Sequence, residues 1–277
     1  MSRIIVTSDL HLGITIEQEI RTLAEQIAAA QPDLTVLAGD LGEGLTNIRA
    51  CLRLFAQLPG QVAILMGNHD VWAYQQQATQ TLWVELLPQV VRDAGMLWLE
   101  ESAWIRDGVA LVGSMTWYDY SAVDPAVRPH VAAWFARHKR RINNDARFVT
   151  WTWSDPEAAR ILGDALHERV RTLEDDPTVR AVMIVTHVPI FRAQMLSKPG
   201  DRRWGISNAY FGNLTLGARL IGMSKLRRVV SGHTHCGREE VVERPGLPSL
   251  PVSVVASDYH RPAYVTIESD SLLAGPA

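Results

Sequence analysis

The sequence has 277 residues, with 27 basic and 30 acidic side chains and a formal net charge of −3. A hydrophobic fraction of 47% and a charged fraction of 21% are typical of globular proteins and exclude a disordered or fibrous chain. No apolar run is long enough for a signal peptide or a membrane-spanning helix, and the two cysteines form no CxxC pattern. We therefore expect a soluble, cytoplasmic protein without disulfides or a membrane partner.

The first third of the chain alternates between expected strands and helices. Apolar runs predict strands over residues 4–7, 34–38 and 61–66. Helical spacing of apolar residues predicts helices over 17–30 and 47–58, the second with Asn47 as its N-cap. This alternation favours right-handed crossovers and a mainly parallel sheet.

After residue 70 the alternation loosens. We expect a helix over 75–91 and short strands over 96–99, 103–106 and 109–113. A Trp-rich helical insertion follows at about 115–178, with helices near 125–141 and 155–174. Strands resume over 181–186, 228–231, 239–242, 252–256 and 263–267. We interpret residues 1–277 as a single domain whose insertion packs over one edge of the sheet.

Five short polar segments lie at the carboxyl ends of expected strands, where open α/β sheets bind ligands. They are Asp9-Leu10-His11, Gly39-Asp40, Gly67-Asn68-His69-Asp70, Thr186-His187 and Gly232-His233-Thr234-His235. Each segment alone is as well explained by a turn or by a hydrogen-bonded histidine. Their joint occurrence at strand ends favours a metal centre, because Asp, His and Asn are ligands for Mn²⁺, Fe, Zn²⁺ or Mg²⁺.

Taken in order, these segments resemble the signature of the calcineurin-like metallophosphoesterases. The resemblance implies a four-layer α/β/β/α sandwich with two mixed β-sheets and two metal ions at one sheet edge, with Mn²⁺ favoured over Fe, Zn²⁺ or Mg²⁺. It also implies the metal ligands: Asp9, His11, Asp40 and His235 for the first ion, and Asp40, Asn68, His187 and His233 for the second, with Asp40 bridging.

The chemistry that such a site implies is hydrolysis of a phosphate ester. Two neighbouring cations lower the pKa of a bridging water, which gives a metal-bound hydroxide near neutral pH. His69 is expected either to protonate the leaving oxygen or to stabilise its charge, and Asp70 is expected to orient the ring of His69.

Departures from the pattern narrow the branch of the family. Residues 39–44 lack the arginine of the protein Ser/Thr phosphatases. Purple acid phosphatases resemble one another in a tyrosine metal ligand three positions after the bridging Asp, and this chain has Glu43 at that position. His69 argues against the lipid A pathway pyrophosphatases, which are similar at Asp-Leu-His-Leu but carry an arginine at that position. The bacterial phosphodiesterase-like branch, which includes cyclic-nucleotide phosphodiesterases, is the most similar.

We therefore predict a phosphoesterase that hydrolyses phosphodiesters or phosphomonoesters, leaning to phosphodiesters of small or nucleotide-like substrates. A nuclease on a DNA or RNA backbone is the alternative, favoured only by basic residues such as Lys139-Arg140-Arg141. A non-catalytic metal-stabilised scaffold is the second alternative, although no signature residue is missing. Trp117 and Tyr118 either stack on a substrate base or pack the insertion onto the sheet, and packing is favoured.

Overall fold

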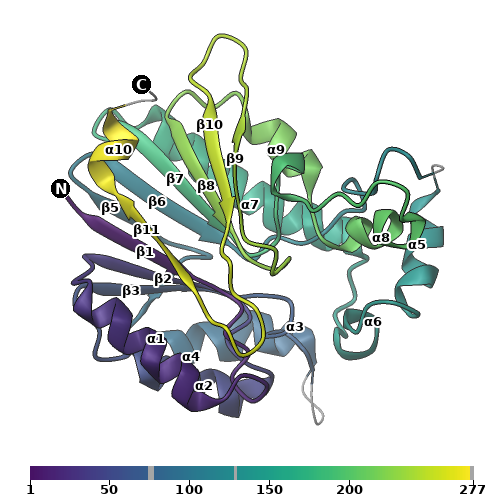
Figure 1. Cartoon of the computed structure of the whole chain (residues 1–277), viewed down its shortest axis with the longest axis horizontal. Helices are drawn as coiled ribbons and strands as arrows, with labels where there is room; N and C mark the ends of the chain where they lie inside the picture. Colours follow the sequence, from purple (N-terminus) through teal and green to yellow (C-terminus); the bar gives the residue numbers. More distant parts are fainter. Residues whose placement is uncertain (74–77, 128–129, 275–277) are drawn as a thin grey trace.

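Two β-sheets packed face to face form the centre of the molecule (Figure 1). The computed structural model describes residues 1–73, 78–127 and 130–274. The first sheet has the strand order β11-β1-β2-β3-β4. Its strands are β1 (Arg3–Thr7), β2 (Leu34–Ala38), β3 (Gln61–Leu65), β4 (Leu97–Trp98) and β11 (Tyr264–Glu268). Strands β1 to β4 are parallel, and β11 pairs antiparallel with β1.

The second sheet has the strand order β5-β6-β7-β8-β10-β9. Its strands are β5 (Ala103–Arg106), β6 (Val109–Ser114), β7 (Ala181–Thr186), β8 (Leu226–Ser231), β9 (Arg238–Val242) and β10 (Leu250–Val254). The four central strands are parallel and the two edge strands are antiparallel. Both sheets are therefore mixed, as the family resemblance implied, and the parallel pairing expected from the alternation in the first third of the chain is confirmed for β1, β2 and β3.

Side chains alternate between the two faces of each sheet, as the period of two in a strand requires. Ile4 and Val6 of β1 face the second sheet and pack with Met183 and Val185 of β7, whereas Ile5 faces the opposite way and packs against helices. This apolar layer between the sheets explains why the strands read as continuous hydrophobic runs.

Helices cover both outer faces, which completes the α/β/β/α sandwich. The first sheet is covered by α1 (Glu17–Ala29), α2 (Gly44–Phe55) and α4 (Leu87–Asp93). The second is covered by α7 (Asp155–Asp175) and α9 (Leu214–Leu220). Helix α7 starts with a capping box, in which Ser154 accepts from the Glu157 amide and Glu157 accepts from Ser154. Its buried residues Leu166 and Val170 pack on β6 and β7, so this helix belongs to the outer layer of the sandwich.

Short helices form a lobe at one end of the sandwich, to the side of both sheets (Figure 1). They are α5 (Ala132–Lys139), α6 (Asp145–Phe148) and α8 (Arg202–Ser207). Lys139 of α5 points inward and forms a buried ion pair with Asp155, with Nζ 2.7 Å from Oδ1. The exposed basic residues of α5 and its C-terminal turn are Arg137, Arg140 and Arg141.

Several expected boundaries were wrong. Helix α2 begins at Gly44, with Glu43 at the N-cap position, and Asn47 lies inside the helix, where its side-chain amide donates to the Glu43 carbonyl. The helix expected over 125–141 contracts to α5, and residues 128–129 lie outside the described part. Of the helix expected over 75–91, residues 75–77 also lie outside the described part, and the described residues form α3 (Thr79–Thr81), a π-helix (Leu82–Leu86) and α4.

The remaining helices are short. They are the 3₁₀ turns Arg192–Gln194 and Asn208–Tyr210 and the C-terminal helix α10 (Ser269–Leu273). Within the described residues, no helix combines the length and apolar character needed to cross a membrane. Cys51 and Cys236 are both free thiols.

Candidate metal centre

The polar segments expected to carry the chemistry meet at one edge, where β1, β2, β3, β7 and β8 end. The backbone there adopts the left-handed region at five non-glycine residues, an uncommon conformation that concentrates at functional sites. These residues and their φ angles are Asp9 (55°), His11 (46°), Asp40 (54°), His233 (70°) and His235 (53°). Each chain therefore turns sharply as it leaves its strand, and the turns direct the side chains toward one another.

Two glycines make this close approach possible. A Cβ on Gly39, whose φ is +88°, would lie 2.6 Å from Nδ1 of His187. A Cβ on Gly67 would lie 2.1 Å from Oδ1 of Asp40. The Gly-Asp and Gly-Asn segments therefore need glycine because side chains of the site occupy the adjacent space.

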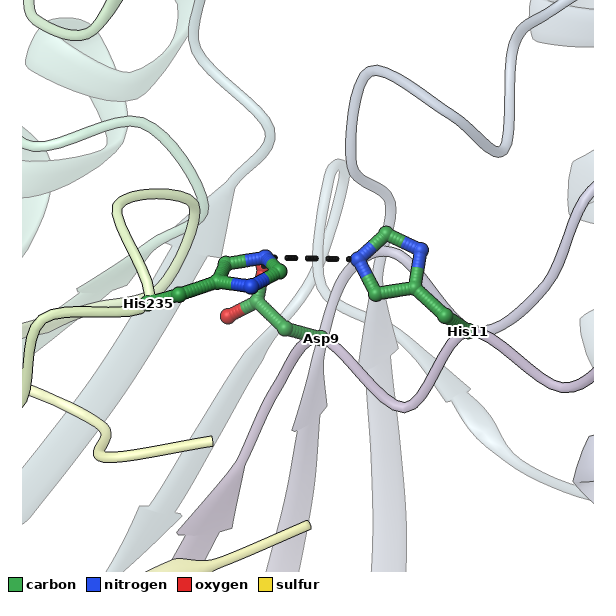
Figure 2. Close-up of side chains that lie close together, drawn as sticks. All are labelled: Asp9, His11 and His235. Atoms are coloured by element: carbon green, nitrogen blue, oxygen red, sulfur yellow. Dashed lines mark hydrogen bonds and ion pairs between the residues drawn. The ribbon is translucent and has the colours of Figure 1, made fainter. Parts of the chain in front are cut away.

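One group of candidate ligands consists of Asp9, His11 and His235, whose ligand atoms all lie within 4.8 Å of one another (Figure 2). The Nε2 atoms of His11 and His235 face each other at 3.3 Å. Nε2 of His235 is also 3.2 Å from Oδ1 of Asp9. Burial lowers the pKa of His11 to about 4, so its ring is neutral, which is the form that binds metals.

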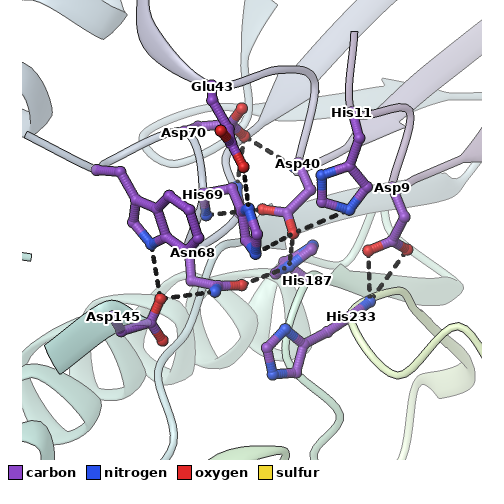
Figure 3. A network of polar contacts seen from close by, with 12 residues as sticks. Asp9, His11, Asp40, Glu43, Asn68, His69, Asp70, Asp145, His187 and His233 are labelled. Carbon is purple, nitrogen blue, oxygen red and sulfur yellow. Dashed lines mark hydrogen bonds and ion pairs between the residues drawn. The ribbon is translucent and has the colours of Figure 1, made fainter. Parts of the chain in front are cut away.

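The second group consists of Asp40, His187 and His233, again with ligand atoms within 4.8 Å of one another (Figure 3). Nε2 of His187 lies 3.4 Å from Oδ2 of Asp40 and 3.1 Å from Oδ1 of Asn68. Nδ1 of His187 donates to the Ala38 carbonyl at 2.9 Å, which directs Nε2 into the site. His233 places Nε2 3.1 Å from the Tyr210 carbonyl, which leaves Nδ1 as its candidate ligand atom.

Asp40 lies between the two groups. Its Oδ2 is 3.6 Å from Nε2 of His11 and 3.4 Å from Nε2 of His187. Asp40 also forms a third group of converging ligand atoms with His11 and His69. One buried carboxylate thus faces histidines from both sides, as a bridging ligand must.

The electrostatics of the edge show what balances its buried carboxylates. Burial alone would raise the pKa of Asp9 and Asp40. The hydrogen bond and charge of His235 instead lower the pKa of Asp9 to about 2, and the charge of His187 holds the pKa of Asp40 well below its ordinary value. Conversely, burial lowers the pKa of His187 and His235, but the Asp40 and Asp9 carboxylates raise these pKa values to about 10 and about 9. Protons on two rings therefore hold the positive charge that cations would supply.

The donor set fits two divalent cations. Imidazole nitrogens, carboxylate oxygens and one amide oxygen converge from five strand ends, without the thiolates typical of structural zinc. Two imidazole nitrogens 3.3 Å apart, together with a carboxylate oxygen 3.2 Å from one of them, are close enough to share one cation. The seven residues predicted as ligands are all brought to this edge.

His69 also lies at the edge, with Nε2 4.0 Å from Oδ2 of Asp40. Its Nδ1 is 3.1 Å from Oε1 of Glu43, and its ring stacks on Trp72 with centroids 3.8 Å apart. Burial lowers the pKa of His69, but the Asp40 carboxylate and the hydrogen bond with Glu43 raise it above its ordinary value. A ring held on one face by Trp72 and at Nδ1 by Glu43 presents Nε2 to the site.

The structure corrects the role expected of Asp70. Its carboxylate accepts hydrogen bonds from the backbone amides of Asp40 and Gly67, both at 2.8 Å, and of Leu41 and Gly42, at 2.9 and 3.3 Å. Asp70 therefore ties the turn after β2 to the turn after β3, and Glu43, not Asp70, is the carboxylate that contacts Nδ1 of His69.

Sequence reasoning gave no role to Glu43 or to Asp145. A signal for Glu43 was its place three residues after Asp40, in a segment that follows a strand. Asp145 is 77 positions from Asn68, yet its Oδ1 accepts from the Asn68 side-chain amide at 2.9 Å (Figure 3). No spacing pattern marks a contact of that kind.

Trp117 and Tyr118 pack inside the protein, which is the alternative that the sequence favoured. Trp117 and Tyr118 are fully buried and stack on each other with centroids 4.8 Å apart. Trp117 donates to Asp155 and Tyr118 donates to Asp145, at 2.8 and 2.7 Å. Neither ring is exposed for stacking on a substrate.

Two cavities lie in this part of the molecule, and one of them is lined by candidate ligands. One, of about 380 Å³, opens over the ligands and is walled by Asn143 and Asn144 of the lobe, by Phe211 and by Tyr259. The other, of about 520 Å³, lies between the loop after β1 and the start of α2, and its walls include Glu43, Asn47 and Arg49. Trp72 lines both cavities.

Comparison with known proteins identifies the fold and the family. A solved structure of a phosphopantetheinyl hydrolase from Mycobacterium tuberculosis is similar, with a TM-score of 0.69 and 20% identity over 93% of this chain and 90% of that chain. A dimetal phosphatase from Danio rerio has a TM-score of 0.56 and 15% identity over 96% of this chain and 91% of that chain. The protein TT1561 of Thermus thermophilus has a TM-score of 0.53 and 13% identity over 94% of this chain and 90% of that chain.

Among curated proteins the sequence comparison finds no match. The family model of the calcineurin-like phosphoesterases matches residues 2–237, which include all five polar segments and strands β1 to β8. The chain therefore belongs to the calcineurin-like phosphoesterase family.

Proposed function

We propose that this metal-dependent phosphoesterase hydrolyses phosphodiesters of small or nucleotide-like substrates at a centre of two divalent cations. Membership of the family makes the chain a hydrolase of phosphate esters. The observation that carries the proposed centre is the position of Asp40, which belongs to two of the groups of converging ligand atoms.

In this proposal the ligands divide between two ions. Asp9, His11, Asp40 and His235 hold the first ion. Asp40, Asn68, His187 and His233 hold the second. Bound there, the cations, for which we favour Mn²⁺, would activate a water molecule for attack and neutralise charge on the phosphoryl oxygens.

His69 acts on the leaving group in this scheme. Its Nε2 faces the ligand edge, and the Asp40 and Glu43 carboxylates raise its pKa and so favour the protonated ring. A proton at Nε2 is then available for the leaving oxygen as the P–O bond breaks. Glu43 stabilises that proton and holds the ring, while Trp72 limits its rotation.

The preference for a diester is supported by the space around the centre. A diester carries a group on each side of the phosphate, and Trp72 lines both the cavity of about 380 Å³ over the candidate ligands and a second cavity of about 520 Å³ at Glu43. A monoester needs room for only one such group. The phosphopantetheinyl hydrolase has a similar fold, and its name adds a phosphopantetheinyl compound to the substrates worth testing.

Hydrolysis of bis-p-nitrophenyl phosphate and of p-nitrophenyl phosphate by metal-depleted protein resupplied with Mn²⁺ tests this proposal. We expect a higher kcat/KM for the diester, and loss of activity on metal removal. His69→Ala should retain both metals and lose most activity on esters with poor leaving groups. A higher kcat/KM for the monoester would make the protein a phosphatase and contradict the diester assignment.

A nuclease is the second candidate, favoured by the exposed arginines of the lobe, Arg137, Arg140, Arg141 and Arg147. Binding of a labelled oligonucleotide that weakens steeply with salt, together with cleavage of it, would favour this candidate over a small substrate.

A further inference from the structure

We propose that Asp145, at the start of α6 in the lobe, is a positioning residue of the metal centre that fixes which end of the Asn68 amide faces the second ion. The inference rests on the proposed function, because it takes Asn68 as a ligand. It makes the lobe a structural part of the centre.

The carboxylate of Asp145 lies fully buried among hydrogen-bond donors. Its Oδ1 accepts from Nδ2 of Asn68 at 2.9 Å and from Nε1 of Trp72 at 2.7 Å. Its Oδ2 accepts from the hydroxyl of Tyr118 at 2.7 Å. Asn143 accepts from the Asp145 amide at 2.7 Å and so fixes the start of the helix. An ionised carboxylate only accepts hydrogen bonds, so these donors have one consistent arrangement.

That arrangement decides the orientation of Asn68. An amide side chain has a donor end and an acceptor end of nearly equal size, and only its oxygen binds a cation. Because Asp145 takes the NH₂ end, Oδ1 of Asn68 faces His187, with Nε2 3.1 Å away. Without this acceptor the amide would be free to turn its nitrogen toward the ion.

Asp145 also anchors Trp72, which stacks on the ring of His69. The same carboxylate oxygen thus restrains a candidate ligand and the aromatic wall of the candidate acid. Residues that orient a ligand in this way commonly change metal affinity by about 10–100-fold when they are lost.

The competing explanation is that Asp145 only stabilises the buried packing of the lobe. Tyr118→Phe separates the two roles, because it removes a buried hydrogen bond to Asp145 but leaves the contact with Asn68 intact. Asp145→Asn is the conservative variant. Its oxygen can still accept from Asn68 and Trp72, while its NH₂ group can donate to the Tyr118 oxygen.

The test is calorimetric titration of metal-depleted protein with Mn²⁺, which reads the affinity of each metal equivalent without relying on activity. We expect Asp145→Ala to weaken the second equivalent by about tenfold or more and to leave the first equivalent within about threefold. Tyr118→Phe and Asp145→Asn should bind both equivalents within about threefold of the unmodified protein. Unchanged affinity in Asp145→Ala, or an equal loss in Tyr118→Phe, would overturn the proposal.

If Asp145→Ala does not fold, exchanging the side chains of Asn68 and Asp145 tests the proposal instead. Asn68→Asp alone sets two carboxylates against each other, whereas Asn68→Asp with Asp145→Asn restores a hydrogen bond between residues 68 and 145 in the reverse direction and gives up the one from Trp72. By charge alone the double variant should bind Mn²⁺ more weakly than Asn68→Asp, because it has one carboxylate fewer than that variant. If residue 145 positions residue 68, the double variant should bind the second Mn²⁺ equivalent more tightly than Asn68→Asp does. Weaker or equal binding would overturn the proposal. Failure of the unmodified protein to bind two Mn²⁺ would instead contradict the two-metal proposal itself.

Discussion

The Nδ1 atom of His69 lies 3.1 Å from Oε1 of Glu43, and this contact joins two turns that leave neighbouring strands of one sheet. Glu43 follows β2 and His69 follows β3. The carboxylate is partly exposed, with 27% of its side chain accessible, whereas 17% of the His69 side chain is accessible. A partly open carboxylate can stabilise a proton on the ring without the large desolvation cost of a buried one.

Glu43→Gln should therefore impair catalysis without emptying the centre. The amide keeps the size of the side chain but removes the charge that helps to raise the pKa of His69. We expect a lower kcat, with the largest loss for diesters whose leaving groups are poor, because these need the proton most. Steady-state kinetics on a series of aryl phosphodiesters, with metal content measured in parallel, checks this. An equal loss across the series would mean that Glu43 does not act through protonation.

Asp70→Asn should instead lower the stability of the fold more than it changes the dependence of activity on the leaving group. Asp70 accepts four backbone amides, and an asparagine would turn its NH₂ group toward two of these donors. Leaving buried donors without acceptors costs on the order of 3 kcal/mol in the free energy of unfolding. Urea unfolding of Asp70→Asn and Glu43→Gln side by side measures the contrast. If Asp70→Asn kept its stability and showed only the leaving-group effect, the role first expected of Asp70 would be correct.

The contrast between Asp70 and Glu43 shows what the sequence can and cannot predict. The strands and the polar segments at their ends were predictable, because apolar runs followed by Asp, His and Asn are local patterns. The partner of His69 was not, because adjacency in the chain suggested Asp70, whereas the turn after β3 points that carboxylate at backbone amides. Asp145 could not be found at all, since its contact with Asn68 depends on how the lobe folds back over the sheet edge.

Asp40→Asn and Asp9→Asn should differ in how many metal ions they lose. Asp40 belongs to two groups of converging ligand atoms and Asp9 to one. Loss of a bridging charge should weaken both equivalents and reduce hydrolysis to background, whereas Asp9→Asn should weaken one equivalent only. Metal analysis after gel filtration, together with Mn²⁺ titration, distinguishes the two variants. Two tightly bound ions in Asp40→Asn would contradict the bridging assignment.

Glu100 gives a prediction about stability that is independent of the metals. Its carboxylate is buried between the sheets and accepts from the amide of Met115 at 2.6 Å and of Met66 at 3.4 Å. Burial raises the pKa of Glu100 from 4.5 to about 7, against the opposing charge of Arg169 and the hydrogen bonds. In this pH range the folded state binds the proton and the unfolded state does not. Stability from Glu100 is therefore fully present below pH 4.5 and is lost as the pH rises to about 7.

Glu100→Gln removes that titration, so the variant should gain stability relative to the unmodified protein as the pH rises. The shift in pKa corresponds to about 3 kcal/mol between the two ends of the range. Unfolding midpoints of both proteins from pH 4.5 to pH 8 give the difference directly, since contributions from other groups cancel. Glu101→Gln is the matched control for the loss of one acidic side chain, because the neighbouring Glu101 side chain is exposed. If the unfolding midpoints of Glu100→Gln and the unmodified protein differed by a constant amount, Glu100 would be charged in the folded protein throughout this range.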